Sequence, residues 1–268
     1  MTKKERGYLT ELYYFALSFF VYGFLGWCTE VAYAAAKQGK FVNRGFLNGP
    51  ICPVYGIGVG VVVQFLTPVE NNLVLLYISS TILVTVIEGI TGFLLEKIFH
   101  NKWWDYSEQP LNIGGYVCML FSLIWGVFCV LIVKIIHPLI YKVLTMIPLV
   151  LGIVVMACLA VGLLADLYVT ASGILKMNRR LEAMEKIAAE LKELSDKVGE
   201  NIYENVMEGM EFREEKKARI EELKVKYEEM AENRTKVGER LVKAFPKMQV
   251  GQHKEIFEEL RERIKRSK

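Results

Sequence analysis

The sequence predicts an all-α protein, a polytopic membrane bundle of about five transmembrane helices followed by a charged, soluble, coiled-coil-like helical tail. Residues 1–173 contain long apolar segments with only ten basic and nine acidic residues. Residues 174–268 contain twenty-three basic and twenty-one acidic residues. A bilayer core about 30 Å thick is crossed by roughly 20 apolar helical residues. We therefore expect a transmembrane core at 1–173 and a separate tail at 174–268.

Five segments of the core qualify as membrane spans by their length and hydrophobicity. The second is the shortest, so the sequence leaves open whether it crosses the membrane or re-enters it. His137 and Pro138 are expected to stop the fourth segment. Short connectors predict that the second and third segments, and the fourth and fifth, are antiparallel neighbours. The segments are approximately residues 12–36, 51–66, 73–98, 113–136 and 143–169.

The distribution of Lys and Arg predicts the orientation in the membrane. With five full crossings, residues 37–50, residues 99–112 and the tail share one side, which carries most of the basic residues near the spans. The positive-inside rule assigns that side to the cytoplasm. The basic N-terminus, with Lys3 and Lys4, argues against an outside location, and both termini would be cytoplasmic if the second segment only re-enters. Either arrangement predicts a multi-pass protein of the cell membrane.

Apolar residues in the tail recur at the three- and four-residue spacing of an amphipathic helix. This spacing predicts two or three helices packed as a hairpin or as a dimeric coiled coil. A chain truncated after about Lys176 is expected to keep a folded membrane core. The repeating positions are Leu181, Met184, Ala188 and Leu191, and then Ile220, Leu223, Tyr227 and Met230.

Residues 41–56 are too polar and too interrupted by Gly and Pro to form a membrane span, yet apolar segments flank them. Asn43 and Arg44 offer side-chain hydrogen bonds within this stretch. Pro50 and Pro53 suit the first turn of a helix, where the missing N–H groups cost little. We expect a structured re-entry into the membrane here.

Four acidic residues lie within the predicted spans, where ionisable groups are costly and are functional hypotheses by default. Glu30 is expected to pair with Arg44, because a buried charge needs a partner. Glu88 lies deeper and has no obvious partner in its own segment, so it is either protonated or binds a proton or cation. Glu96 and Asp166 lie near segment ends and are interpreted as ordinary interface residues.

The second long loop contains Trp104, Asp105 and Tyr106, followed by Asn112. Its aromatic residues are typical of a membrane interface, although they also suit a binding site beside the intramembrane acids. The predicted binding residues are therefore Glu30, Asn43, Arg44, Glu88, Trp104, Asp105, Tyr106 and Asn112.

Several absences narrow the class of protein. The five cysteines form no C-x-x-C pair, no P-loop or H-E-x-x-H motif occurs, and no G-x-S-x-G is present. The net charge of +3 comes without a one-sign block, so no nucleic-acid partner is expected. The sequence predicts no catalytic residue, no metal and no cofactor. A membrane enzyme acting on lipid-linked substrates through Glu30, Glu88 or Asp105 is a less favoured alternative.

An ordered set of motifs resembles the bacterial family of permeases described as Putative ABC-transporter type IV. The resemblance covers roughly residues 15–170 and leaves the charged tail outside. It implies a multi-pass membrane protein of the permease type, with no established substrate. The chain lacks the EAA-type loop by which typical importer permeases dock an ATPase. The motifs are residues 24–30, residues 43–56, Glu88, residues 104–107, Asn112, Trp125 and Gly126.

Two functions from different classes follow. The core is expected to be a permease-like transport component, with its polar site built from the 41–56 loop and the intramembrane acids. Besides the lipid bilayer, an ATPase subunit or a second copy of the chain would then be its partner, because five helices make a small bundle. Alternatively, the core anchors a regulatory tail that binds a cytoplasmic protein.

Overall fold

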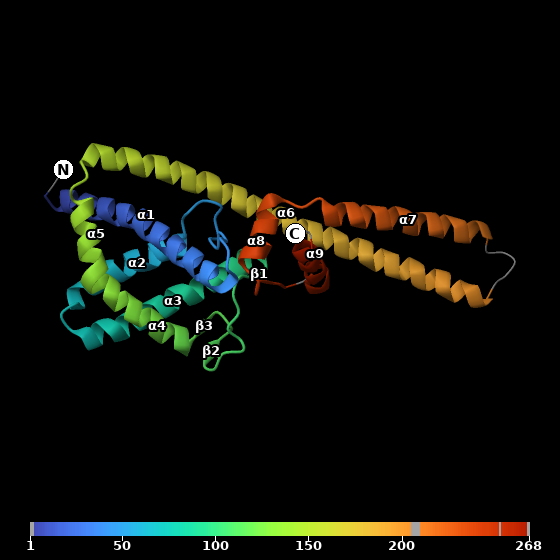
Figure 1. Cartoon of the computed structure of the whole chain (residues 1–268), viewed down its shortest axis with the longest axis horizontal. Coiled ribbons are helices and arrows are strands. Elements are labelled where there is room, and N and C mark those ends of the chain that lie inside the picture. The colour runs from blue at the N-terminus through green and yellow to red at the C-terminus, as the bar shows by residue number, and fades with distance from the viewer. Residues whose placement is uncertain (1–2, 205–209, 252, 267–268) are drawn as a thin grey trace. The chain divides into compact units, whose positions relative to one another are not determined.

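The computed structural model describes residues 3–204, 210–251 and 253–266, and it describes side chains outside residues 3–8 and 198–213. Contacts divide the chain into two compact units. The first contains residues up to Thr170 together with Lys243–Gln249, and the second contains Ala171–Val242 and Val250–Lys268. Helices dominate both units (Figure 1), which confirms the predicted all-α class.

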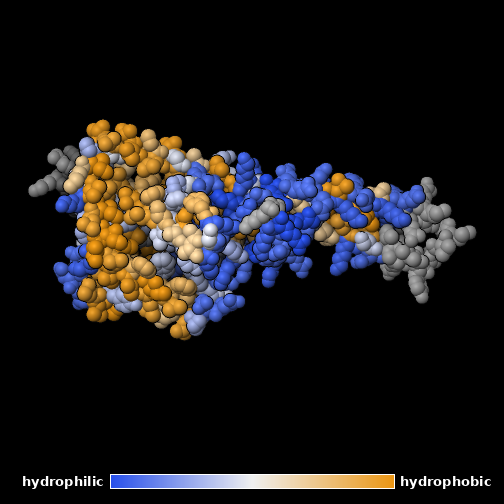
Figure 2. Space-filling model, viewed as in Figure 1, coloured by the Kyte–Doolittle hydropathy of each residue, from blue (hydrophilic) through white to orange (hydrophobic). Residues whose placement is uncertain are grey.

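The first unit is a bundle of apolar helices with the surface of a membrane protein. Among the described residues, four helices are long and apolar enough to cross a membrane, and Figure 2 shows a broad hydrophobic surface over this unit. Their candidate spans are Leu9–Gln38, Leu73–Phe99, Met119–Leu144 and the apolar part of Leu149–Lys197. The helices are α1 (Lys3–Gln38), α2 (Pro53–Leu66), the 3-10 turn η1 (Thr67–Val69), α3 (Leu73–Phe99), α4 (Met119–Leu131), the π-helical turn η2 (Ile132–Ile136), α5 (His137–Leu144) and the first part of α6 (Leu149–Glu204).

The second predicted segment forms α2, which is a short helix rather than a fifth long one. It begins at Pro53, in agreement with the expected role of this proline in a first helical turn, whereas Pro50 lies before the helix and does not have that role. Its 14 residues rise about 21 Å at 1.5 Å each, less than the roughly 30 Å of a bilayer core. The bundle therefore consists of four long apolar helices and one short apolar helix.

The prediction that His137 and Pro138 stop the fourth segment is wrong. The chain stays helical from Met119 through η2 and α5 to Leu144. Pro138 lies in the first turn of α5, directly after the π-helical turn. A π-turn already interrupts the regular ladder of hydrogen bonds, so the missing N–H of the proline does not end the helix.

Glycines allow α1 and α2 to pack closely as antiparallel neighbours. The backbone N–H of Cys52 donates to the carbonyl of Gly23 at 2.9 Å, which ties the start of α2 to α1. A Cβ atom added at Gly56 would lie 2.5 Å from the carbonyl oxygen of Phe19. Further along α2, a Cβ atom at Gly60 would lie 2.8 Å from the ring of Phe15.

The connection from α3 to α4 contains short strands instead of an unstructured loop. Strand β2 (Asn112–Ile113) pairs in antiparallel fashion with β3 (Val117–Cys118). Strand β1 (Asn101–Lys102) pairs with β4 (Gln249–Val250). In the first unit, the ring of Phe245 also packs edge-on against Trp103, with centroids 5.2 Å apart. A short piece of the predicted tail thus belongs with the membrane core.

The second unit is helical, as the spacing of the tail predicts. It comprises the rest of α6, α7 (Met210–Glu232), most of α8 (Lys236–Ala244) and α9 (Lys254–Arg266). An ion pair of 3.0 Å between Glu190 and Arg219 links α6 to α7. Its interior contains the predicted Leu181, Met184 and Leu223, together with Leu241, Phe257 and Leu260.

Candidate functional site

Asn43 organises the loop between α1 and α2. Its Oδ1 accepts hydrogen bonds from Nε1 of Trp27 at 2.7 Å and from the backbone N–H of Gly45 at 3.1 Å. Its Nδ2 donates to the carbonyl of Asn48 at 2.7 Å. These bonds occupy most of the amide's capacity, so we assign Asn43 to the framework of the loop.

Asp166 of α6 fastens the same loop to the bundle. Its Oδ1 accepts from the backbone N–H and Nδ2 of Asn48 at 3.1 and 2.8 Å, and its Oδ2 accepts from the N–H of Gly49 at 2.6 Å. The hydroxyl of Thr170 donates to the same carboxylate at 3.2 Å. Asp166 therefore has a specific structural role in addition to its predicted position near the end of a segment. No local pattern reveals this contact, because its partners are 117 and 118 residues away in the sequence.

Glu30 lies in a charged and aromatic cluster at the loop end of α1. Its Oε2 is 3.3 Å from Nε of Arg44, so the predicted ion pair is present. Its Oε1 accepts a hydrogen bond of 2.7 Å from the hydroxyl of Tyr55, a partner that the sequence analysis missed. The guanidinium of Arg44 also lies 4.8 Å from the ring centre of Tyr33, within the range of a cation–π contact. The side chains of Arg44 and Glu30 keep exposed fractions of 30% and 26%, so the pair is only partly desolvated.

Glu88 of α3 meets Tyr106 from the connection between α3 and α4. The Tyr106 hydroxyl donates to Oε1 of Glu88 over 3.4 Å, which is a long and weak hydrogen bond. The other oxygen, Oε2, is buried and makes no hydrogen bond with the residues that the structure describes. The Tyr106 ring stacks on Phe121 with centroids 4.9 Å apart, which holds the hydroxyl in place. Glu88 is thus an intramembrane carboxylate with one weak neutral partner.

The environment of Tyr106 determines how its hydroxyl behaves. Burial raises the pKa of the Tyr106 hydroxyl, and the charges of Glu88 and, to a smaller extent, of Glu30 raise it further. The hydroxyl therefore stays protonated and acts as a donor at neutral pH. Glu88 and Tyr106 thus form one cluster, and Glu30, Arg44 and Tyr55 form another.

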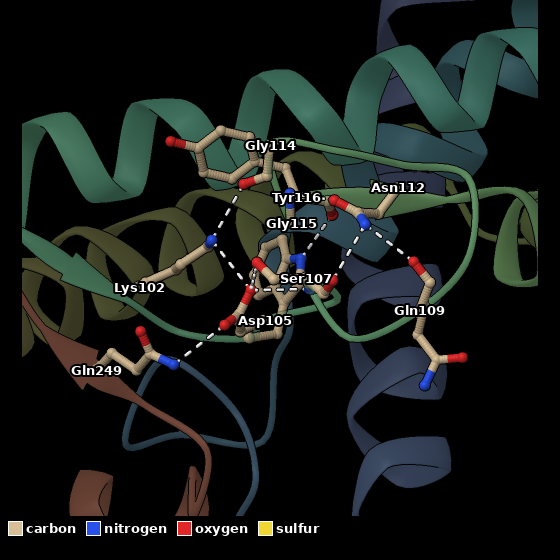
Figure 3. Close-up of polar contacts among 10 residues, drawn as sticks. Lys102, Asp105, Ser107, Gln109, Asn112, Gly114, Gly115, Tyr116 and Gln249 are labelled. Carbon is tan, nitrogen blue, oxygen red and sulfur yellow. Dashed lines mark hydrogen bonds and ion pairs between the residues drawn. The ribbon is translucent and has the colours of Figure 1, made fainter.

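Asp105 is used to fold the connection between α3 and α4 (Figure 3). Its Oδ1 accepts from the backbone N–H of Ser107 at 3.0 Å and lies 3.0 Å from Nζ of Lys102. Its Oδ2 accepts from Nε2 of Gln249 at 3.0 Å. Desolvation alone would raise the pKa of Asp105, but the hydrogen bonds from Ser107 and Lys102 outweigh it and lower the pKa to about 2. Asp105 is therefore ionised at neutral pH and already has its partners.

Asn112 and Trp104 also support this connection. Nδ2 of Asn112 donates to the carbonyl of Gln109 at 2.8 Å, and its Oδ1 accepts from the N–H of Gly115 at 3.1 Å (Figure 3). Nε1 of Trp104 donates to the carbonyl of Tyr116 at 2.8 Å. Among the predicted residues of this connection, Tyr106 is the one that reaches an intramembrane acid. Within the part of the chain that the structure describes, no group of His, Cys, Asp and Glu is arranged to hold a metal ion.

The part of the chain that matches a known protein family is nearly the same as the first unit. A family model described as Putative ABC-transporter type IV matches residues 17–171. The chain belongs to this family. The match runs from α1 to just beyond Asp166 and Thr170, so it includes both clusters and the contact that fastens the loop. The helical second unit lies outside it. Comparisons with curated proteins and with solved structures gave no match.

Proposed function

We propose that the membrane core is a transport component, and that its polar site consists of Glu30, Arg44, Tyr55, Glu88 and Tyr106. The observation that carries this proposal is the different environment of the two carboxylates. Glu30 has a cationic partner 3.3 Å away, whereas the described partner of Glu88 is the neutral hydroxyl of Tyr106. Membership of the ABC-transporter type IV family supports a role in transport.

Glu88 is the residue that we propose to exchange a proton or a small cation. An unpaired carboxylate within an apolar helix costs free energy when it is charged, and protonation or cation binding removes that cost. The buried Oε2 offers the free lone pairs that either ion needs. Arg44 compensates the charge of Glu30, whereas Glu88 has no cationic partner among the described residues.

A partner is needed to complete a transport pathway, because four long helices and one short helix form a small bundle. We propose that the partner is an ATPase subunit or a second copy of the chain. The family description supports an ATPase, and the chain has no P-loop of its own. Purifying the full chain from its native membranes in mild detergent, followed by mass spectrometry and native mass measurement, tests this. A co-purifying P-loop ATPase or a dimer supports the proposal, and a monomer without either contradicts it.

The second unit favours an interaction function as the other candidate. It has its own buried apolar interior and an ion pair between α6 and α7, and it lies outside the family match. In this alternative the core is an anchor, and the second unit binds a cytoplasmic protein. Loss of cellular function when Glu88 is intact but the α7 surface is recharged by Arg219→Glu would favour it.

The substitution Glu88→Gln tests the transport proposal directly. Gln keeps the shape and the contact with Tyr106 but removes ionisation, so we expect normal folding and a loss of transport. The loss should be at least about tenfold, which corresponds to roughly 1.4 kcal/mol of missing interaction. Growth of a strain that needs the protein, with melting temperature measured in parallel, provides the readout.

Glu96→Gln is the matched control, because Glu96 lies on the same helix closer to its end and also has a buried Oε2 without a hydrogen bond among the described residues. We expect this variant to retain function. Wild-type growth of the Glu88→Gln strain would show that the carboxylate has only a structural role. A large fall in its melting temperature would lead to the same conclusion.

A further inference from the structure

The first unit contains a second polar feature, a cavity of about 470 Å³ between α1, α2 and α5. Its size lies within the roughly 300–1,000 Å³ typical of small-molecule sites. The contacts between α1 and α2 show its location. Cys52 bonds to Gly23 near the 41–56 loop, whereas Gly60 meets Phe15 at the cavity. The cavity therefore lies at the opposite end of this helix pair from Glu30 and is separate from the polar site described above.

Aromatic rings form much of the cavity wall. Tyr14 of α1 and Tyr141 of α5 have ring centroids 5.1 Å apart, and Tyr141 is 5.8 Å from His137. The Tyr22 hydroxyl is hydrogen-bonded to Nδ1 of His137 at 2.9 Å, and the two rings are stacked. These contacts join α1 to α5 and fix the orientation of the rings. The electron-rich faces of such rings attract cations.

Glu11 supplies the charge of the cavity. It precedes Tyr14, Phe15 and Ser18 by three, four and seven positions, so helical spacing puts all four on one face of α1. No Lys or Arg is among the described residues that line the cavity, and Glu11, which is exposed, forms no ion pair with any side chain that the structure describes. The cavity wall thus combines a carboxylate that has no cationic partner among the described side chains with aromatic rings and with Ser18, which is 5% exposed.

We propose that this cavity binds an ammonium group. A carboxylate repels anions, and the aromatic rings favour a diffuse organic cation over a strongly hydrated metal ion. The amine of a small soluble molecule and the amine of a lipid headgroup both present this chemistry. Glu11 neutralises the positive charge, while Tyr14 and Tyr141 contact its alkyl groups.

The test uses the full chain in detergent and measures its melting temperature. Choline chloride is compared with sodium chloride at equal ionic strength. In a second arm, mixed micelles containing phosphatidylethanolamine are compared with micelles containing the same fraction of phosphatidylglycerol. A ligand that binds the folded state raises the melting temperature. A rise with choline identifies a soluble cation as a ligand, and a rise with phosphatidylethanolamine alone identifies a lipid headgroup.

Four variants assign the effect to the cavity. In Glu11→Gln we expect at least about tenfold weaker apparent affinity, with an unchanged melting temperature in the absence of ligand. Glu70→Gln removes a carboxylate that lies outside the cavity and should behave as wild type. Tyr141→Phe keeps the ring and should bind, whereas Tyr141→Leu removes it and should bind more weakly. An absent rise in both arms, or an equal rise in wild type and Glu11→Gln, would overturn the proposal.

Discussion

At the scale of single residues, the loop between α1 and α2 depends on carboxylates that come from other helices. Asp166 accepts two backbone N–H bonds from Asn48 and Gly49, and Glu30 holds Arg44. Hydrogen bonds to charged groups are stronger than neutral ones and are costly to leave unmade. Asp166 and Glu30 therefore have structural partners. Glu88 and Glu96 of α3 each have a buried oxygen without a hydrogen bond among the described residues, and Glu88 lies farther from the end of the helix.

We expect Asp166→Asn to loosen the loop. The neutral amide weakens the bonds from Asn48 and Gly49, at a cost of about 1–3 kcal/mol. Cys52 lies at the end of this loop and is only 5% exposed, so its alkylation rate in a variant without the other cysteines reports loop opening. The rate should rise in Asp166→Asn. The control is Glu96→Gln, and an alkylation rate that stays equal in both variants would contradict the role of Asp166.

Arg44 and Glu30 should show coupled energies in a double-mutant cycle. Because both side chains are partly exposed, the coupling should be about 1–2 kcal/mol, between the values of exposed and buried pairs. Arg44→Ala, Glu30→Gln and the double variant are compared by thermal unfolding in detergent. Glu30→Gln should partly restore the stability lost in Arg44→Ala. Strictly additive losses would mean that the two charges do not interact.

At the scale of elements, the packing of α1 against α2 depends on which glycines face the partner helix. A Cβ at Gly56 would lie 2.5 Å from the backbone oxygen of Phe19, which cannot move without shifting α1. A Cβ at Gly58 finds its nearest neighbour, Cγ2 of Ile87, at 4.0 Å. Two glycines that are two residues apart in α2 therefore have different roles.

This difference predicts opposite effects of Gly56→Ala and Gly58→Ala on stability. Ala stabilises a helix by about 1 kcal/mol relative to Gly, so Gly58→Ala should be neutral or stabilising. Gly56→Ala must separate the two helices and should destabilise by about 1–3 kcal/mol, the usual cost of overpacking. Melting temperatures of the purified variants in one detergent measure both effects. Similar melting temperatures for the two variants would refute the close contact at Gly56.

At the scale of the whole molecule, the membrane unit and the family match end at nearly the same place. The boundary between the two compact units lies after Thr170, and the family match ends at residue 171. The helix α6 continues through this point without a break. A short later piece, residues 243–249, returns to the first unit and contacts Trp103 and Asp105. The core therefore draws on two separate parts of the sequence.

The contacts of residues 243–249 with the first unit predict how truncation after Lys176 changes stability. The shortened chain should still insert into the membrane, because the apolar parts of the candidate spans precede the cut. It should melt about 2–4 °C lower, because it loses the Phe245–Trp103 contact, which is worth about 1 kcal/mol. Phe245→Ala in the full chain should reproduce much of this shift. Aggregation of the truncated chain would instead show that the second unit is required for folding.

The sequence predicted the class of the fold because hydrophobicity and spacing are local properties. The long apolar segments became four candidate spans, and the three- and four-residue spacing of the tail became α6 and α7. The pairing of Glu30 with Arg44 followed from charge balance, since each lacked another partner nearby. His137 and Pro138 misled the prediction, because the π-helical turn before them is a feature that no residue pattern announces. The orientation in the membrane stays a prediction.

The sequence by itself determined that the chain has a membrane core and a helical tail. It also identified the acidic residues within apolar segments, because a charged group in the membrane is costly whatever the tertiary structure. The tertiary structure alone decided which of those acids are satisfied. Asp166 binds the loop from more than a hundred residues away in the sequence, Asp105 binds Gln249, and Tyr106 is the one partner of Glu88 among the described residues. Such partners are set by the packing of distant segments, and the free energy of a carboxylate depends on the donors that this packing brings within about 3 Å.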